Sequence, residues 1–133
     1  MNGKSDFDVE KEIAYWHNLA LKDLQFASRL IAREEEEMLY CLFFLHLSLE
    51  KVFKAHIVKQ TKQLPPKTHN LLLLAELGRV DLSGEQIDFC GRINLYNIEA
   101  RYPNLFIPSP NLQKAKEYFE QTKEILEWLV RQL

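Results

Sequence analysis

Apolar side chains recur at steps of three and four residues from about Phe7 to Arg33. This spacing places them on one face and predicts a first helix. The run Glu34 to Glu37 then interrupts the apolar pattern, and we expect a turn near Glu34. The apolar positions of this helix are Ile13, Trp16, Ala20, Leu24, Ala27 and Ile31.

A second helix is predicted from about Glu36 to Thr61. Its first half, Met38 to Leu45, is apolar nearly all round, which is typical of a helix buried on most sides. We therefore expect it to be the central element of a bundle. Acidic residues gather at its predicted start and lysines toward its end, as the helix dipole favours. Pro65 and Pro66 follow the helix and end it.

Two shorter helices follow in the pattern. Thr68 is placed to cap a third helix that runs through Leu77 and is closed by Gly78. Ser83, with Gln86 three residues later, forms the capping box of a fourth helix over about Gly84 to Arg101.

A last helix is signalled by Ser109 and Pro110, an N-cap followed by a first-turn proline. Its apolar positions alternate steps of three and four as far as Leu133, a seam suited to a helix partner. Strand alternation and internal repeats are absent from the sequence. The fold class predicted is all-α, an up-and-down bundle of about five helices forming a single domain over 1–133.

Composition limits the classes of protein that fit. The chain has 133 residues, 47% hydrophobic and 27% charged, with a net charge of −2, so no strong overall attraction to nucleic acid or membrane is expected. Cys41 and Cys90 lie in apolar segments and are predicted to be reduced core residues. The first residues lack the apolar stretch of a signal peptide, and the longest apolar run is far shorter than the ~20 residues of a membrane span. These features favour the cytosol.

Several kinds of active site lack their sequence signatures. The glycines are scattered and form neither a GxGxxG motif nor a P-loop. The histidines at 17, 46, 56 and 69 show none of the spacings of zinc or di-iron sites. We expect neither a metal nor a cofactor.

A polar stripe, His46, Glu50 and Lys54, follows one line of the second helix at steps of four. One interpretation is an ordinary Glu–Lys pair near the surface, with His46 satisfied in the core. The other is that a desolvated Glu50 requires a cationic partner from another helix, because an unpaired buried carboxylate is costly. Arg101 is then the candidate for a structural ion pair with Glu50.

A local excess of positive charge follows this stripe, since residues 51–75 contain no Asp or Glu. The lysines can interact favourably with the negative end of the helix dipole and keep the protein soluble. Alternatively, they can bind the phosphates of a nucleotide or RNA. The basic side chains are Lys51, Lys54, Lys59, Lys62 and Lys67, with His56 and His69.

Near the end of the fourth helix, Asn94, Asn97 and Arg101 fall on one stripe, with Tyr96 on another flank. Two amides and a guanidinium can read a base or hold a phosphate. They can equally form the solvated side of an amphipathic helix, and the sequence favours that interpretation.

Four segments in this order resemble the HEPN family, the higher eukaryote and prokaryote nucleotide-binding domain. They are WHNLALKDLQFA from Trp16, LEKVFKA from Leu49, PPKTHNLLLL from Pro65 and LYNIEARYP from Leu95. Each motif is short, but together they cover most of the chain. The resemblance implies a helical bundle that is often a homodimer.

The resemblance also implies nucleotide- or RNA-related functions. Some family members are ribonuclease toxins paired with a small nucleotidyltransferase, and these resemble one another in an Arg-x4-6-His motif. Arg101 occupies the arginine position here, but Phe106, Ile107 and Pro108 stand where a histidine would follow. The chain is similar instead to the branch that ends in Arg-Tyr-Pro.

We therefore expect a non-catalytic nucleotide- or RNA-binding module that acts as a homodimer beside a nucleotidyltransferase partner. The alternatives are a metal-independent ribonuclease that uses Arg101 with His69 or His46, and a domain that binds only proteins. Apolar surface on the second and last helices, beyond what a small bundle covers, also favours a homodimer. The candidate nucleotide- or phosphate-binding residues are Lys51, Lys54, His69, Tyr96, Asn97, Arg101 and Tyr102.

Overall fold

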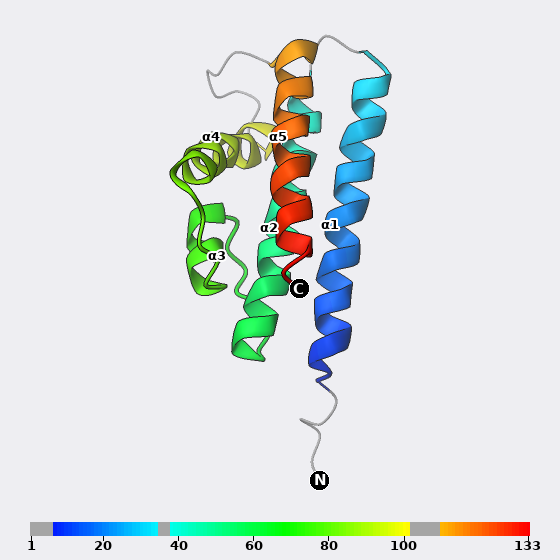
Figure 1. Cartoon of the computed structure of the whole chain (residues 1–133). Helices are drawn as coiled ribbons and strands as arrows, with labels where there is room; N and C mark the ends of the chain where they lie inside the picture. The colour runs from blue at the N-terminus through cyan, green and yellow to red at the C-terminus, as the bar shows by residue number, and fades with distance from the viewer. Residues whose placement is uncertain (1–6, 35–37, 102–109) are drawn as a thin grey trace.

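The computed structural model of the chain describes residues 7–34, 38–101 and 110–133, and in 98–101 the backbone alone. These residues form five helices: α1 (Val9–Ala32), α2 (Leu39–Thr61), α3 (Leu71–Leu77), α4 (Gly84–Arg101) and α5 (Leu112–Val130). In Figure 1, α1, α2 and α5 lie alongside one another as a bundle, whereas α4 crosses this bundle and α3 lies beside α2. The predicted all-α bundle is confirmed.

Helix α2 is the central element, as predicted. It packs against all four other helices, and side chains from every side of it are buried. Leu42, Leu45, Leu49 and Phe53 are fully buried within one core shared by the helices. Because α2 is enclosed in this way, its polar residues must find partners within the protein.

The connection between α1 and α2 lies close to the predicted turn. Helix α1 ends at Ala32, and Glu34 adopts a left-handed backbone with φ of 55°. The predicted start of the second helix near Glu36 lies outside the described residues; α2 begins at Leu39, and its first turn holds no acidic residue. The amide of Met38 donates instead to the carbonyl of Pro110, 3.0 Å away, which ties this connection to the start of α5.

Helix α3 has a different cap from the one predicted. The side chain of Asn70 accepts from the amide of Leu72, while Thr68 accepts from the amide of Asn70 and thus supports the turn before the cap. Gly78 ends α3 as expected. A Cβ on Gly78 would lie 3.1 Å from the Cβ of His56, a tight contact, so glycine favours the close packing of α3 against α2.

The capping box of α4 is confirmed. The amide of Gln86 donates to Ser83 Oγ at 3.1 Å, and the Gln86 side chain accepts from the amide of Ser83 at 2.8 Å. The predicted start of α5 is wrong. Asn111 caps the helix by accepting from the amide of Lys114, and Ser109 lies outside the described residues.

Both cysteines are free and buried, as predicted. Burial raises the pKa of each thiol to about 12, so both are protonated and unreactive at neutral pH. Within the described ranges, no helix combines the length and apolar character needed to cross a bilayer.

Candidate functional site

A buried carboxylate, Glu50, lies in the middle of α2, where only 5% of its side chain is exposed. Lys54 Nζ donates to Glu50 Oε2 at 3.0 Å, one helical turn along. His69 Nδ1, from the loop between α2 and α3, lies 3.1 and 3.2 Å from the two carboxylate oxygens. Glu50 therefore has the predicted lysine partner, and its partner from outside α2 comes from a loop and not from another helix as expected. That second partner is His69, while the side chain of Arg101 lies outside the described residues.

His46 forms the second layer of this network, one turn before Glu50. Its Nε2 lies 3.0 Å from the carbonyl oxygen of His69 and 3.3 Å from Asn94 Oδ1. Both neighbours are acceptors, because Asn94 Oδ1 already accepts from the amide of Leu71 at 3.0 Å. His46 Nε2 must therefore carry the proton. Its Nδ1 then accepts from Asn97 Nδ2, 3.4 Å away.

The environment of His46 favours its neutral form. Burial lowers its pKa from 6.5 to about 4, and this effect exceeds the opposing influence of the Glu50 charge, whose Oε1 lies 3.8 Å from Nδ1. The neutral His46 side chain thus joins α2 to the loop before α3 and to α4 through hydrogen bonds.

His69 differs from His46 in exposure, since 47% of its side chain reaches solvent. To donate to the Glu50 carboxylate, His69 must carry a proton on Nδ1. In the neutral ring this leaves Nε2 as an acceptor. Here a carboxylate binds one imidazole nitrogen and leaves the other available. This arrangement orients a histidine for ligand binding or proton transfer.

The basic side chains of α2 that were considered for phosphate binding mostly have partners within the protein. Lys51 Nζ lies 2.6 Å from a carboxylate oxygen of Asp23 on α1. Lys54 pairs with Glu50 and also lies over the ring of Trp16, with Nζ 5.4 Å from the ring centre. Lys59 donates to the carbonyl of Gln132, and Lys62 to the carbonyl of Lys59. The structure thus uses these lysines to join helices and to cap α2, and a phosphate would compete with those contacts.

On α4, the two described residues of the predicted stripe, Asn94 and Asn97, both contact His46. The prediction that Asn97 lies on the solvated side is wrong, because Asn97 is buried and contacts His46. Tyr96 is buried too, with its ring edge-on to Tyr118 and Lys114 Nζ 5.5 Å from its centre. Tyr96 therefore belongs to the core rather than to an open stacking surface.

Two further candidates fall at the limit of the described chain. Arg101 is the last residue of α4, but the direction of its side chain is not described. Tyr102 lies outside the described residues. The structure thus brings together His69, Lys54 and Asn97 around Glu50 and His46. It places Lys51 and Tyr96 in other contacts.

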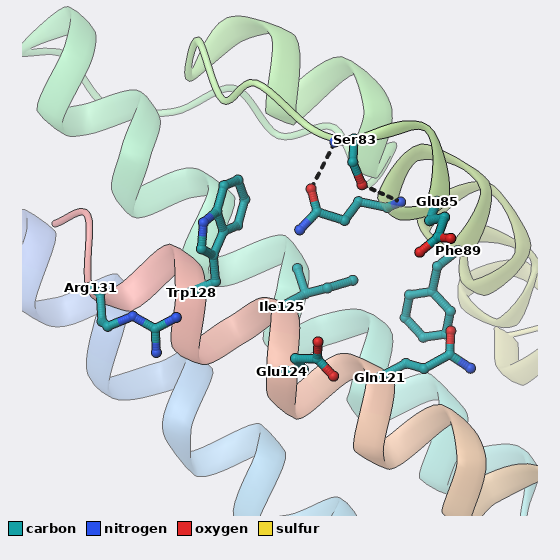
Figure 2. Close-up of a pocket in the computed structure, with 9 residues that line it drawn as sticks. Ser83, Glu85, Phe89, Gln121, Glu124, Ile125, Trp128 and Arg131 are labelled. Carbon is teal, nitrogen blue, oxygen red and sulfur yellow. Dashed lines mark hydrogen bonds between the residues drawn. The ribbon is translucent and has the colours of Figure 1, made fainter.

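A separate pocket of about 400 Å³ lies between the start of α4 and the end of α5 (Figure 2). Ile125 lies between Trp128 and Phe89 in this view, and the dashed lines mark the capping box of Ser83 and Gln86. Sequence reasoning did not single out this pocket, whose lining mixes charges of both signs. It is lined by Ser83, Glu85, Gln86, Phe89, Gln121, Glu124, Ile125, Trp128 and Arg131.

Comparison with known proteins establishes the family. The model of the HEPN domain matches residues 13–133, nearly the whole chain. The chain belongs to the HEPN family. Among solved structures, the crystal structure of TT1696 from Thermus thermophilus is similar, with a TM-score of 0.77 and 19% sequence identity. The match covers 91% of this chain and 98% of that one, and supports the fold. No curated protein sequence matches the chain significantly.

One member of the network, Asn70, was not predicted from the sequence of this HEPN domain. Asn70 caps α3 and accepts from Asn94 Nδ2 at 3.2 Å, and Asn94 in turn accepts from the amide of Leu71. The sequence feature that could have indicated this role is the polar segment Thr68 to Asn70, which lies between two apolar helices.

Among the described residues, no three His, Cys, Asp or Glu side chains gather as a metal site requires.

Removal of the Glu50 charge should destabilise the fold strongly. Glu50→Gln leaves Lys54 buried without a counter-charge, which is expected to lower the free energy of unfolding by about 3–5 kcal/mol. Replacing both partners, as Glu50→Leu with Lys54→Met, should recover most of that loss. Urea denaturation measures both, with the exposed Glu124→Gln as control, expected to change stability by less than about 0.5 kcal/mol. If Glu50→Gln were as stable as wild type, the buried Lys54 would not need the Glu50 charge as its partner.

Stability should also fall with acid in a defined range. Because the pKa of His46 is lowered from 6.5 to about 4 by burial, the unfolded chain binds a proton that the folded one excludes. Stability is therefore complete above about pH 6.5 and declines as pH falls toward 4, with His56 contributing in the same direction. Urea midpoints across this range should depend less on pH in His46→Gln than in wild type. His17→Gln, outside the network, should keep the wild-type dependence.

Proposed function

We propose that this HEPN domain is a nucleotide- or RNA-binding module whose ligand contacts the exposed ring of His69. The observation that supports it most is the fixed orientation of that ring. A buried carboxylate holds Nδ1, and the opposite nitrogen can accept from a ribose hydroxyl or a base amino group. Lys67, exposed and two residues before His69, is proposed to contact a phosphate of that ligand.

The remaining parts of the proposed function derive from the family. Arg101, at the end of α4, and Tyr102 after it are proposed to complete the ligand site, with the Arg-Tyr-Pro ending. We further propose that the domain works in the cytoplasm beside a small nucleotidyltransferase, as in a toxin–antitoxin pair. A domain that binds only acidic proteins is the competing interpretation of the basic segment. The pairing of Lys51 with Asp23 and of Lys54 with Glu50 weakens it.

A second candidate function is RNA cleavage, favoured by the Glu50–His69 contact. In this reaction His69 Nε2 takes the proton of a ribose 2′-hydroxyl, and the 2′-oxygen attacks the adjacent phosphorus. The bond from phosphorus to the 5′-oxygen breaks, and that oxygen receives the proton from the histidine. The products are a 2′,3′-cyclic phosphate and a 5′-hydroxyl. His46 is a poor candidate for this role, because it is fully buried and both of its nitrogens have partners.

Binding is tested by fluorescence anisotropy with a labelled mixed-sequence RNA and, separately, labelled ATP. Wild type should bind at low salt and weaken steeply as salt rises. His69→Gln should weaken binding about tenfold, as expected for loss of one hydrogen bond of about 1.4 kcal/mol, while His17→Gln should bind like wild type. Both variants must first be shown to be folded at the assay temperature. If neither the RNA nor ATP binds at low salt, the proposal is refuted and a protein-binding domain is favoured.

Cleavage is tested on the same RNA, incubated in EDTA and separated on a denaturing gel. If His69 transfers protons, fragments ending in 2′,3′-cyclic phosphate should form in wild type and disappear in His69→Gln. His17→Gln should cleave at the wild-type rate. If the RNA stays intact after prolonged incubation with wild type, cleavage is excluded and the binding proposal alone stands.

A further inference from the structure

The pocket between α4 and α5 has an apolar base formed by Phe89, Ile125 and Trp128 (Figure 2). Phe89 and Ile125 are buried, and Trp128 is half-buried. The ring of Phe89 packs edge-on against Tyr118, with the ring centres 5.1 Å apart, so the core holds this base in place. The volume of about 400 Å³ lies within the range of small-ligand pockets. A ligand with an aromatic ring can therefore bury that ring against the apolar base.

Two carboxylates line the same pocket, one from each helix. Glu85 lies in the first turn of α4, Glu124 lies on α5, and both are exposed. Neither forms an ion pair with another described residue. In Figure 2, Arg131, the one basic residue among the described lining residues, lies at the opposite end of the pocket from Glu85. A cation above the apolar base would thus meet two carboxylates without displacing an ion pair between described residues.

These charges distinguish the pocket from the proposed RNA site at His69. The phosphates of a nucleotide or RNA would approach Glu85 and Glu124, and like charges repel. A neutral apolar ligand would cover the carboxylates and remove them from water without offering a partner. An organic cation with a ring avoids both costs, because its ring packs on the apolar base while its charge faces the carboxylates and the indole of Trp128.

We propose that the pocket between α4 and α5 binds a small aromatic amine. The ring of the ligand packs against the apolar base, and its ammonium group faces the two carboxylates. The capping box of Ser83 and Gln86, which both line the pocket, fixes its wall at the start of α4 before any ligand arrives. The two helices that build the pocket are joined by the bound ligand, so binding should also stabilise the folded protein.

Titration with 2-phenylethylamine, followed by NMR, tests both binding and its location. The chain has two tryptophans, so the indole N–H signal of Trp128 is assigned by its loss in Trp128→Phe. This signal should shift with a dissociation constant of about 1 mM or tighter, whereas the Trp16 signal should stay in place. The uncharged 2-phenylethanol should bind about tenfold more weakly, and the anionic 3-phenylpropanoate weaker still. A Trp128 signal that ignores the amine, or that responds equally to the alcohol, would overturn the proposal.

Removal of the carboxylate charges tests the contact with the ammonium group. Glu85→Gln and Glu124→Gln preserve the shape of exposed side chains, and each should weaken amine binding about threefold, the double variant about tenfold. Glu127→Gln, an exposed acid of α5 that does not line the pocket, should bind like wild type. Unchanged affinity in the double variant would contradict the proposed contact. His69→Gln should bind the amine like wild type, so failure here leaves the proposed RNA site untouched.

A lysine analogue separates a free amine from the side chain of a partner protein. N-acetyl-lysine methylamide carries the same ammonium group on an alkyl stem without a ring. It should bind more weakly than 2-phenylethylamine, because it cannot fill the apolar base with an aromatic ring. If it binds as tightly, the pocket accepts a lysine of another protein, and the proposal of a small aromatic amine fails.

Discussion

The structure depends on a carboxylate buried in its most enclosed helix. Glu50 lies in the middle of α2, where water cannot solvate its charge, and a buried charge without partners would cost several kcal/mol. Lys54 supplies a counter-charge from the same helix, and His69 supplies a hydrogen bond from the following loop. His46, one turn earlier, then binds the backbone of that loop and the amides of α4. Glu50 and His46 together thus tie the α2–α3 loop and α4 to the central helix.

This arrangement links stability to the proposed function. The same contact that satisfies Glu50 also sets the direction of the His69 ring and leaves its second nitrogen on the surface. A ligand that donates to that nitrogen meets a group whose orientation has already been fixed by folding, which lowers the entropic cost of binding. The polar network is therefore more than a means of tolerating polar residues in a core. It presents one imidazole in a defined state to solvent.

Much of the fold could be predicted from the sequence, because apolar spacing reports burial directly. The central place of α2 follows from Met38 to Leu45, and the start of α4 from Ser83 and Gln86. The caps of α3 and α5 could not be predicted in the same way. Thr68 and Asn70 are both capable caps, and the choice of Asn70 is coupled to its contact with Asn94, which is distant in sequence.

The site was harder to predict than the fold. The spacing of Glu50 and Lys54 predicts their pair, but His69 becomes a partner only through a loop whose path the sequence does not reveal. Asn97 was misassigned because amide side chains are usually solvated, whereas here the buried His46 requires them.

The most direct test of the role of Glu50 is the tautomeric state of the two network histidines, read from long-range ¹H–¹⁵N NMR spectra of the imidazoles at mildly alkaline pH. We predict opposite tautomers, with the proton on Nε2 in His46 and on Nδ1 in His69. Only the resonances of folded protein should show this difference. An Nε2-protonated His69, or exchange averaging between its two tautomers, would contradict the claim that Glu50 holds this ring for a ligand.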